Sequence, residues 1–248
     1  MLQEERIPES ATRQPWHISE LERQSTVEND GRGVLGKVVQ RASKEGGSSI
    51  GGALHFLADG ELLMESRTKR LLLREWKDED IEPLARMNDD PRVVRYLARL
   101  ADRNAIEVWI NAQREHFKKH GYGLWALERL DIAGSIGFCG LVNVPYQAHF
   151  TPAVEIAWRL HPDWWGRGYA TEAAVAALAF GFQNLKLNQI VANAAGDNVA
   201  SRRLMERIGM SHDPKGDFDH PFKAVDDPLR RQVLYRLLYQ DWRQKLQK

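Results

Sequence analysis

The sequence has little of what secreted, metal-bound or membrane proteins depend on. One cysteine, Cys139, stands among 248 residues, which excludes an internal disulfide and a cysteine-only metal site and favours a reducing compartment. The 35 Lys and Arg residues balance 34 Asp and Glu to a net charge of +1, which argues against a dedicated nucleic-acid binder. The longest apolar run, 173–182, is too short to cross a bilayer, and the first twenty residues lack the apolar core of a secretory signal. We expect a cytoplasmic protein that binds neither nucleic acid nor a membrane.

Composition divides the chain into two parts. Overall, 43% of the residues are hydrophobic and 28% are charged, as in ordinary globular domains. Residues 1–63 hold 8 of the 19 glycines and show no sustained apolar period, so we expect a flexible or weakly structured N-terminal extension. Residues 64–248 would form the folded domain. An alternative is that Met64, just before a clear strand, is the natural start of the chain.

Hydrophobic periodicity predicts a mixture of strands and helices in the second part. Strands are expected at 70–76, 124–129, 135–144, 154–160, 189–195 and 233–239, and helices at 81–88, 104–120, 170–182 and 198–207. The helix 104–120 would place Ile106, Val108, Trp109 and Phe117 near one face. The helix 170–182 is apolar almost all round and is expected to be buried. This order of elements indicates a mixed α/β sheet.

The most informative segment joins the strand 154–160, a loop with two glycines and the most apolar helix. Gly166 and Gly168 would let the backbone approach a ligand, and free N–H groups at a helix start favour a phosphate, with Arg167 as a charged contact. A plain tight turn is the alternative for the two glycines alone. The loop lacks the Lys-Ser/Thr pair of a Walker motif, and Thr171 stands where a dinucleotide fingerprint needs Gly or Ala.

Residues 160–171, Leu-His-Pro-Asp-Trp-Trp-Gly-Arg-Gly-Tyr-Ala-Thr, resemble motif A of the GNAT N-acetyltransferases, whose core is Gln/Arg-x-x-Gly-x-Gly/Ala. Trp165 stands where Gln or Arg is usual, a departure familiar in the Rim-type branch, which contains the ribosomal-protein N-terminal acetyltransferases. Residues 198–210 resemble the second signature of that branch, and residues 68–74 resemble its first strand. The resemblance covers roughly residues 66–243.

The resemblance implies the GNAT acyltransferase fold, a splayed mixed β-sheet of about seven strands flanked by helices. Acetyl-CoA, the co-substrate, would lie where the strands 154–160 and 189–195 separate, and no metal is implied. Backbone groups of Trp158 and Leu160 would pair with the pantetheine arm like an added strand. For Asn198, a simple helix N-cap is the alternative to a contact with the same arm. The implied cofactor-binding residues are Trp158, Leu160, Trp165, Gly166, Arg167, Gly168, Tyr169, Ala170, Thr171 and Asn198.

The implied reaction transfers an acetyl group to a primary amine by direct attack in a ternary complex. The amine must lose a proton, because amines titrate above neutral pH. Glu155 is the candidate base, the alternative being a strand carboxylate that faces solvent. Ser201 is the candidate partner of the leaving thiolate, the alternative being a serine bonded to its own helix. Met205 stands where many GNAT enzymes have a tyrosine acid.

The missing tyrosine keeps a second function open, a catalytically silent acyl-CoA-binding module that senses the cofactor or scaffolds a partner. The acceptor, a protein N-terminus, a lysine or a small-molecule amine, would be set by residues 78–120 and by the loop 212–231. The protein is expected to be a monomer or a homodimer. Asp217, Asp219 and His220 match no known metal spacing, and the prolines and glycine around them indicate an exposed turn region.

Overall fold

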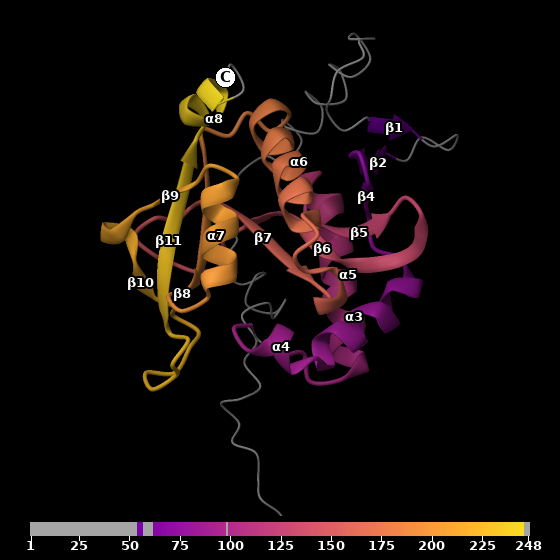
Figure 1. Ribbon diagram of the computed structural model, residues 1–248, viewed down its shortest axis with the longest axis horizontal. Coiled ribbons are helices and arrows are strands. Elements are labelled where there is room, and N and C mark those ends of the chain that lie inside the picture. Colours follow the sequence, from indigo (N-terminus) through magenta and orange to yellow (C-terminus); the bar gives the residue numbers. More distant parts are fainter. Residues whose placement is uncertain (1–53, 57–61, 98, 246–248) are drawn as a thin grey trace, which may run out of the picture.

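The computed structural model describes residues 54–56, 62–97 and 99–245 (Figure 1). Its strands are β1 (Leu54–Phe56), β2 (Leu62–Met64), β3 (Ser66–Arg67), β4 (Leu71–Arg74), β5 (Leu124–Arg129), β6 (Ile132–Asn143), β7 (Val154–Leu160), β8 (Gln189–Ala195), β9 (Ser211–His212), β10 (Phe218–Asp219) and β11 (Arg231–Leu238). Its α-helices are α3 (Ile81–Asp89), α4 (Pro91–Val94), α5 (Arg103–His120), α6 (Tyr169–Gln183), α7 (Val199–Arg207) and α8 (Tyr239–Lys245), with short 3-10 helices η2 (Asp78–Asp80), η3 (Pro162–Trp164) and η4 (Pro214–Gly216). Apart from β1 and part of β2, which pair with each other, the expected N-terminal extension lies outside the described residues.

Nine of these strands form one sheet. Its order is β10-β11-β8-β7-β6-β5-β4-β3, and β9 also pairs with β11. The pairs are antiparallel except for β7 and β8, which run parallel. The predicted mixed α/β sheet is confirmed. The sheet has more strands than expected because β3, β9 and β10 are two residues long, too short to produce an alternating pattern in the sequence.

Helices cover both faces of the sheet (Figure 1). The core on one face joins the central strands to α6, α7 and α8 and also includes Phe117 of α5, and the core on the other face joins the strands to α3 and the rest of α5. Along β5, Trp125 and Leu127 belong to the first core, whereas Leu124 and Ala126 belong to the second. This alternation follows from the two-residue period of a strand, and it keeps the two cores separate.

The sheet opens between β7 and β8. Seven registered residue pairs join β6 to β7, whereas β7 and β8 share only the pair Glu155 and Val191. The other edge of β8 stays fully paired with β11. Beyond the single contact, the facing edges of β7 and β8 diverge and leave backbone groups available for another chain of hydrogen bonds. The opening expected between 154–160 and 189–195 is confirmed.

Two helical faces differ from the expectation. On α5, Ile106, Trp109 and Phe117 are buried, but Val108 is 46% exposed. A residue two positions after Ile106 lies about 200° round the helix and therefore points to the opposite side. On α6 the prediction of burial all round is wrong for Val175, which is 49% exposed.

A buried ion pair attaches η2 and the start of α3 to the sheet. Arg74 Nη1 and Nη2 donate to the two oxygens of Asp80 at 2.7 and 2.9 Å, and both residues are buried. Arg74 Nε also donates to Glu128 on β5 at 2.7 Å, and Asp80 accepts from the Lys77 amide at 2.8 Å. These bonds hold η2, and with it the start of α3, against β4 and β5.

We predict that Asp80→Asn lowers the free energy of unfolding by about 3 kcal/mol, because it removes one charge of a buried pair while Glu128 still faces Arg74. Urea denaturation would measure the change. The matched control is Glu115→Gln, which breaks the exposed pair with Lys118 and should cost less than about 0.5 kcal/mol. Equal losses in the two variants would contradict this role for the buried pair.

Candidate active site

The loop between β7 and α6 presents backbone N–H groups that no side chain caps. Gly166 and Gly168 have φ angles of 72° and 80°, in the left-handed region that favours glycine. Gly168 is the N-cap of α6 and offers no side-chain acceptor to the first turn, which begins at Tyr169. A helix start of this kind, with its positive dipole end, suits a phosphate. The phosphate-binding role of 166–171 stays a prediction, and the geometry that it requires is present.

A carboxylate in the first turn of α6 ties this loop to the residues before β4. Glu172 accepts hydrogen bonds from Thr68 Oγ1 at 2.6 Å, from the Arg70 amide at 2.8 Å and from Arg70 Nε at 2.6 Å. Arg70 Nη1 in turn donates to the carbonyl of Arg167 at 3.0 Å. Burial alone would raise the pKa of Glu172, but these hydrogen bonds lower it. Hydrogen bonds from the residues before β4 therefore hold this loop both at the Arg167 carbonyl and at the first turn of α6.

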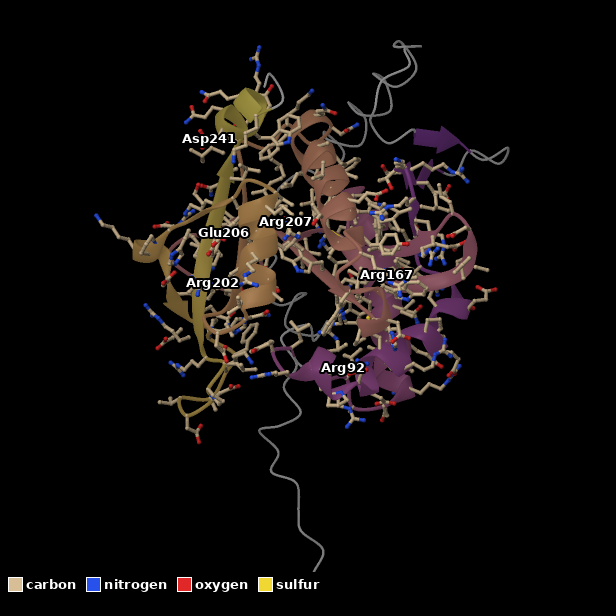
Figure 2. All side chains as sticks on the ribbon, viewed as in Figure 1. Arg92, Arg167, Arg202, Glu206, Arg207 and Asp241 are labelled. Atoms are coloured by element: carbon tan, nitrogen blue, oxygen red, sulfur yellow. The ribbon has the colours of Figure 1, made fainter. Side chains whose placement is uncertain are left out.

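Guanidinium groups and aromatic rings alternate around the same loop. Arg70 lies 4.5 Å from the ring centre of Tyr169, and Trp164 has Arg129 at 4.8 Å and Arg167 at 5.3 Å from its own. Figure 2 labels Arg167 near the end of α6 where the loop enters the helix. Each contact gains from the negative face of the ring. Arg70 is paired with Glu172 and Arg129 with Asp131, so the net positive charge beside the uncapped helix start comes from Arg167 and would favour an anion there.

Successive residues of β7 direct their backbone N–H and C=O groups alternately toward β6 and toward the open edge. The His161 amide donates to the Ile136 carbonyl on β6 at 3.0 Å, so the backbone groups of His161 face β6. By alternation, those of Leu160 and Trp158 face the open edge. The Leu160 carbonyl accepts from the indole Nε1 of Trp165 at 2.7 Å, which fixes the loop to the end of the strand. This leaves the Leu160 N–H and the groups of Trp158 along the opening, where the sequence predicted a cofactor contact.

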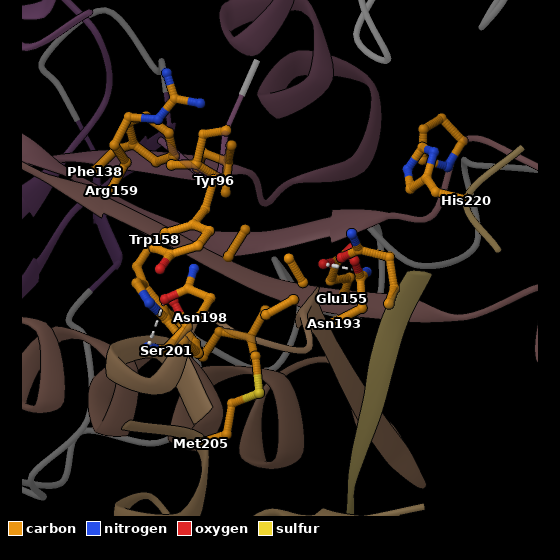
Figure 3. A pocket seen from close by; sticks show the side chains of 18 of the residues that line it. Tyr96, Phe138, Glu155, Trp158, Arg159, Asn193, Asn198, Ser201, Met205 and His220 are labelled. Atoms are coloured by element: carbon orange, nitrogen blue, oxygen red, sulfur yellow. Dashed lines mark hydrogen bonds between the residues drawn. The ribbon is translucent and has the colours of Figure 1, made fainter. Parts of the chain in front are cut away.

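The start of α7 lies across the opening. Asn198 is the N-cap of α7, and its Oδ1 accepts from the Ser201 amide at 3.2 Å. Within the described part of the chain, its Nδ2 and the Ser201 hydroxyl have no hydrogen-bond partner, and both residues line the same pocket as Trp158 and Met205 (Figure 3). Asn198 therefore is an N-cap and still has an amide available for a ligand. The hydroxyl of Ser201 is not bonded to its own helix, so that alternative is wrong.

Glu155 lies at the one point where β7 and β8 touch. Its side chain is 8% exposed and accepts from Asn193 Nδ2 on β8 at 2.7 Å (Figure 3). Tyr146 is a close neighbour, and its own pKa is raised by burial and by Glu155. Burial raises the pKa of Glu155 to about 8, against a smaller opposing effect of Asn193. The alternative of a solvent-facing strand carboxylate is therefore wrong, and a base with this pKa is matched to work near neutral pH.

The loop 212–231 contributes more than an exposed turn. His220 is 8% exposed and packs against Tyr146 with ring centres 4.6 Å apart and ring planes tilted by 56°, among Phe218 and Phe222. Burial lowers the pKa of His220 to about 4, so its ring is neutral near pH 7. The expectation of an exposed region is wrong here, because three aromatic rings bury the histidine beside the pocket. An aromatic residue at every second position, 218, 220 and 222, was a signal of this burial.

Sequence reasoning also missed Asn193, Tyr146 and Arg159, which line the pocket with Glu155. Asn193 lies on a strand that the sequence predicted, but its contact depends on the register between β7 and β8. Among the described residues, no three His, Cys, Asp or Glu side chains are grouped so that they could hold a metal ion. None of the described helices is long and apolar enough to cross a membrane.

We predict that Glu155→Gln stabilises the protein in a pH-dependent way. The folded state holds the Glu155 proton up to about pH 8, whereas the unfolded chain loses it near the ordinary pKa of 4.5, so stability falls as the pH rises between these two values. The variant should not show the loss of stability that the wild type shows between pH 4.5 and 8. The difference in the free energy of unfolding between the two proteins should therefore grow over this range, to a few kcal/mol. Urea denaturation of both proteins at pH 5 and pH 8 would measure it, with pH 5 as the internal control. A constant difference would contradict the buried carboxylate.

Comparison with known proteins identifies the family. Residues 70–211 match the family model described as an acetyltransferase (GNAT) domain. The protein YkkB of Bacillus subtilis (strain 168) is 34% identical over 146 residues, 58% of this chain and 84% of that protein. The [ribosomal protein uS5]-alanine N-acetyltransferase of Escherichia coli (strain K12) is 25% identical over 130 residues, 51% of this chain and 63% of that protein. The crystal structure of a GNAT-family acetyltransferase from Bacillus anthracis superposes with a TM-score of 0.57 at 25% identity, over 71% of this chain and 99% of that one. The resemblance noted in the sequence is confirmed: the chain belongs to the GNAT acetyltransferase family.

Proposed function

We propose that this GNAT N-acetyltransferase transfers the acetyl group of acetyl-CoA directly to a primary amine that binds between β7 and the loop 212–231. The observation that carries the proposal is the position of Glu155, buried and with a pKa of about 8, at the single contact of β7 with β8. The uncapped start of α6, the open edge of β7 and the amide of Asn198 fit the pyrophosphate and pantetheine parts of acetyl-CoA.

In this reaction Glu155 removes the proton from the bound ammonium, directly or through a water molecule. The amine nitrogen then forms a bond to the thioester carbonyl carbon. As the tetrahedral intermediate collapses, the C–S bond breaks and the nitrogen loses its second proton, which the departing thiolate takes up. The N–H of Trp158, on the open edge of β7, would donate to the oxyanion. The hydroxyl of Ser201 would donate to the departing thiolate, a role that Met205 cannot fill.

A catalytically silent acyl-CoA-binding module is the competing function, and Met205 in the place of a tyrosine is the observation that favours it. The two functions differ in one measurement, the release of CoA thiol when the wild-type protein is given acetyl-CoA and a panel of primary amines. Binding of acetyl-CoA with no thiol release on any amine would leave the silent module.

We predict that Gly168→Val weakens acetyl-CoA binding at least tenfold while the protein stays folded. A valine there would place its Cβ 3.4 Å from Arg70 Nη2, beside the start of α6 where the phosphate would bind. Gly134→Val is the control, because Gly134 also has a positive φ, 96°, but lies in open space. Calorimetry with acetyl-CoA measures both. A wild-type affinity for Gly168→Val would refute the binding site at α6.

We predict that Glu155→Gln lowers kcat by about 10²–10⁴-fold, the usual contribution of a positioned base, while the Kd of acetyl-CoA stays close to that of the wild type. In the wild type the rate should rise through about pH 8 as the carboxylate ionises, and the variant should lack that rise. Glu107→Gln, on the exposed side of α5, is the control and should keep full turnover.

The opposite outcome is equally specific. If the protein captures the small neutral fraction of the amine without a base, Glu155→Gln will lose less than tenfold, and its rate will keep rising toward the amine's own pKa. Glu155 would then be a strand residue, and positioning and the oxyanion contact would supply the catalysis.

A further inference from the structure

The side chain of Asn193 lies beside Glu155 because of the register between two strands. Val191 of β8 is the registered partner of Glu155 on β7. Ile156 and Ala192 belong to the core under α6, so by alternation Glu155, Val191 and Asn193 all lie on the opposite face of the sheet. Asn193 is therefore the next residue of β8, beyond the single contact, on the face that carries Glu155.

The amide of Asn193 uses both of its N–H groups on this face. Nδ2 donates to Glu155 Oε1 at 2.7 Å (Figure 3) and to the hydroxyl oxygen of Tyr146 at 3.4 Å. An acceptor for each of the two hydrogens fixes the direction in which the amide is turned. Among the residues that the structure describes, no other side chain hydrogen-bonds to Glu155. The orientation of this carboxylate therefore depends on one residue of the neighbouring strand.

The second oxygen of Glu155 is free and can be reached. Within the described ranges Oε2 has no hydrogen-bond partner, and it is not one of the fully buried polar atoms that lack one. Glu155 lines the pocket, so Oε2 is the oxygen that a bound amine can approach. One oxygen of the carboxylate is thus held by Asn193, and the other is available for a proton.

We propose that Asn193 is the positioning residue of the base, holding Glu155 Oε1 so that Oε2 faces the bound amine. The proposal rests on the function proposed above and names the residue through which β8 takes part in it. The amide also favours the charged form of Glu155 and so opposes the effect of burial, because an N–H donor stabilises a carboxylate. Without it, the carboxylate would be free to rotate and would ionise at a higher pH.

The other titratable groups around Glu155 keep their charge over the pH range that matters here. Burial and Glu155 raise the pKa of Tyr146, and burial lowers the pKa of His220 to about 4, so both are neutral between pH 7 and 9. Burial lowers the pKa of Arg159 to about 10, and this side chain stays charged below pH 9. Lys223 is engaged in an ion pair within its own loop. A rate that changes with pH in this range, relative to a variant, therefore reports on Glu155.

The test measures the pH dependence of kcat in the full-length protein by thiol release. The probe is acetyl-CoA with whichever of phenethylamine, lysine, spermidine and an alanyl peptide reacts fastest. Asn193→Leu is close in volume and removes both N–H groups. It should lower kcat about tenfold or more at pH 7 and move the rise of the rate from about pH 8 to about pH 9 or above, so that its deficit is about fivefold smaller at pH 9.

Two further variants frame this result. Asn193→Gln keeps the amide on a longer stem and should recover part of kcat at pH 7. Asn188→Leu makes the same substitution at an exposed residue just before β8 and outside the pocket, and it should match the wild type. Asn193→Ala, which introduces no larger side chain, should show the same alkaline shift as Asn193→Leu. Melting curves and the Kd of acetyl-CoA check that each variant is folded.

A double variant separates positioning from a general loosening of β8. If Asn193 acts through Glu155, its replacement should matter little once the carboxylate is gone. Glu155→Gln combined with Asn193→Leu should therefore match Glu155→Gln alone within about threefold in kcat. A variant that only loosened the strand would add the same loss in both backgrounds and at every pH.

The outcomes distinguish this proposal from the one on which it rests. A deficit in the Asn193 variants that is equal at pH 7 and pH 9, or that adds in full to that of Glu155→Gln, would overturn the positioning role and leave Glu155 as the base. A loss of less than tenfold in Glu155→Gln would overturn the base and the role of Asn193 with it. Acetyl-CoA binding without thiol release on any amine would overturn the transfer reaction itself.

Discussion

The separation of β7 from β8 is the constraint on which the rest of this structure depends. A parallel pair in a continuous sheet would satisfy its backbone groups along its whole length, but here one registered pair is followed by divergence. Full pairing on the outer sides, to β6 and to β11, keeps both strands rigid while their inner edges stay open. The opening is therefore bordered by two strands that each remain fully paired on one side. It places α6, α7 and the loop 212–231 around one space.

The position of Glu155 at that single contact explains its electrostatics. Where the strands still touch, the Glu155 side chain is largely shielded from solvent, and the Asn193 amide replaces only part of the hydration that its carboxylate would have in water. The point at which β7 and β8 separate thus determines which side chain is shielded from solvent, and through that shielding it sets the pKa of Glu155.

The sequence predicted what local patterns encode. Strands β5, β7 and β8 were predicted to the residue, since alternating or continuous apolar residues with clear turns bound each of them. The loop 160–171 was found because its glycines and the helix start are adjacent in the chain. Asn193, Arg159 and His220 were missed as site residues, because their place beside Glu155 depends on sheet register and on which loop covers the pocket. Strands of two residues, such as β9 and β10, carry too little pattern to be predicted at all.

The hydrogen bonds that Thr68 and Arg70 donate to Glu172 have a consequence for the order in which parts of the chain must fold. Its partners Thr68 and Arg70 are 104 and 102 residues away in the chain, so the loop 160–168 cannot be fixed by its own neighbourhood. Closing a loop of that length costs entropy before any contact repays it. In a nascent chain that has completed β7 and α6, this loop is therefore fixed only after β4 has docked on β5 and brought Thr68 and Arg70 to Glu172.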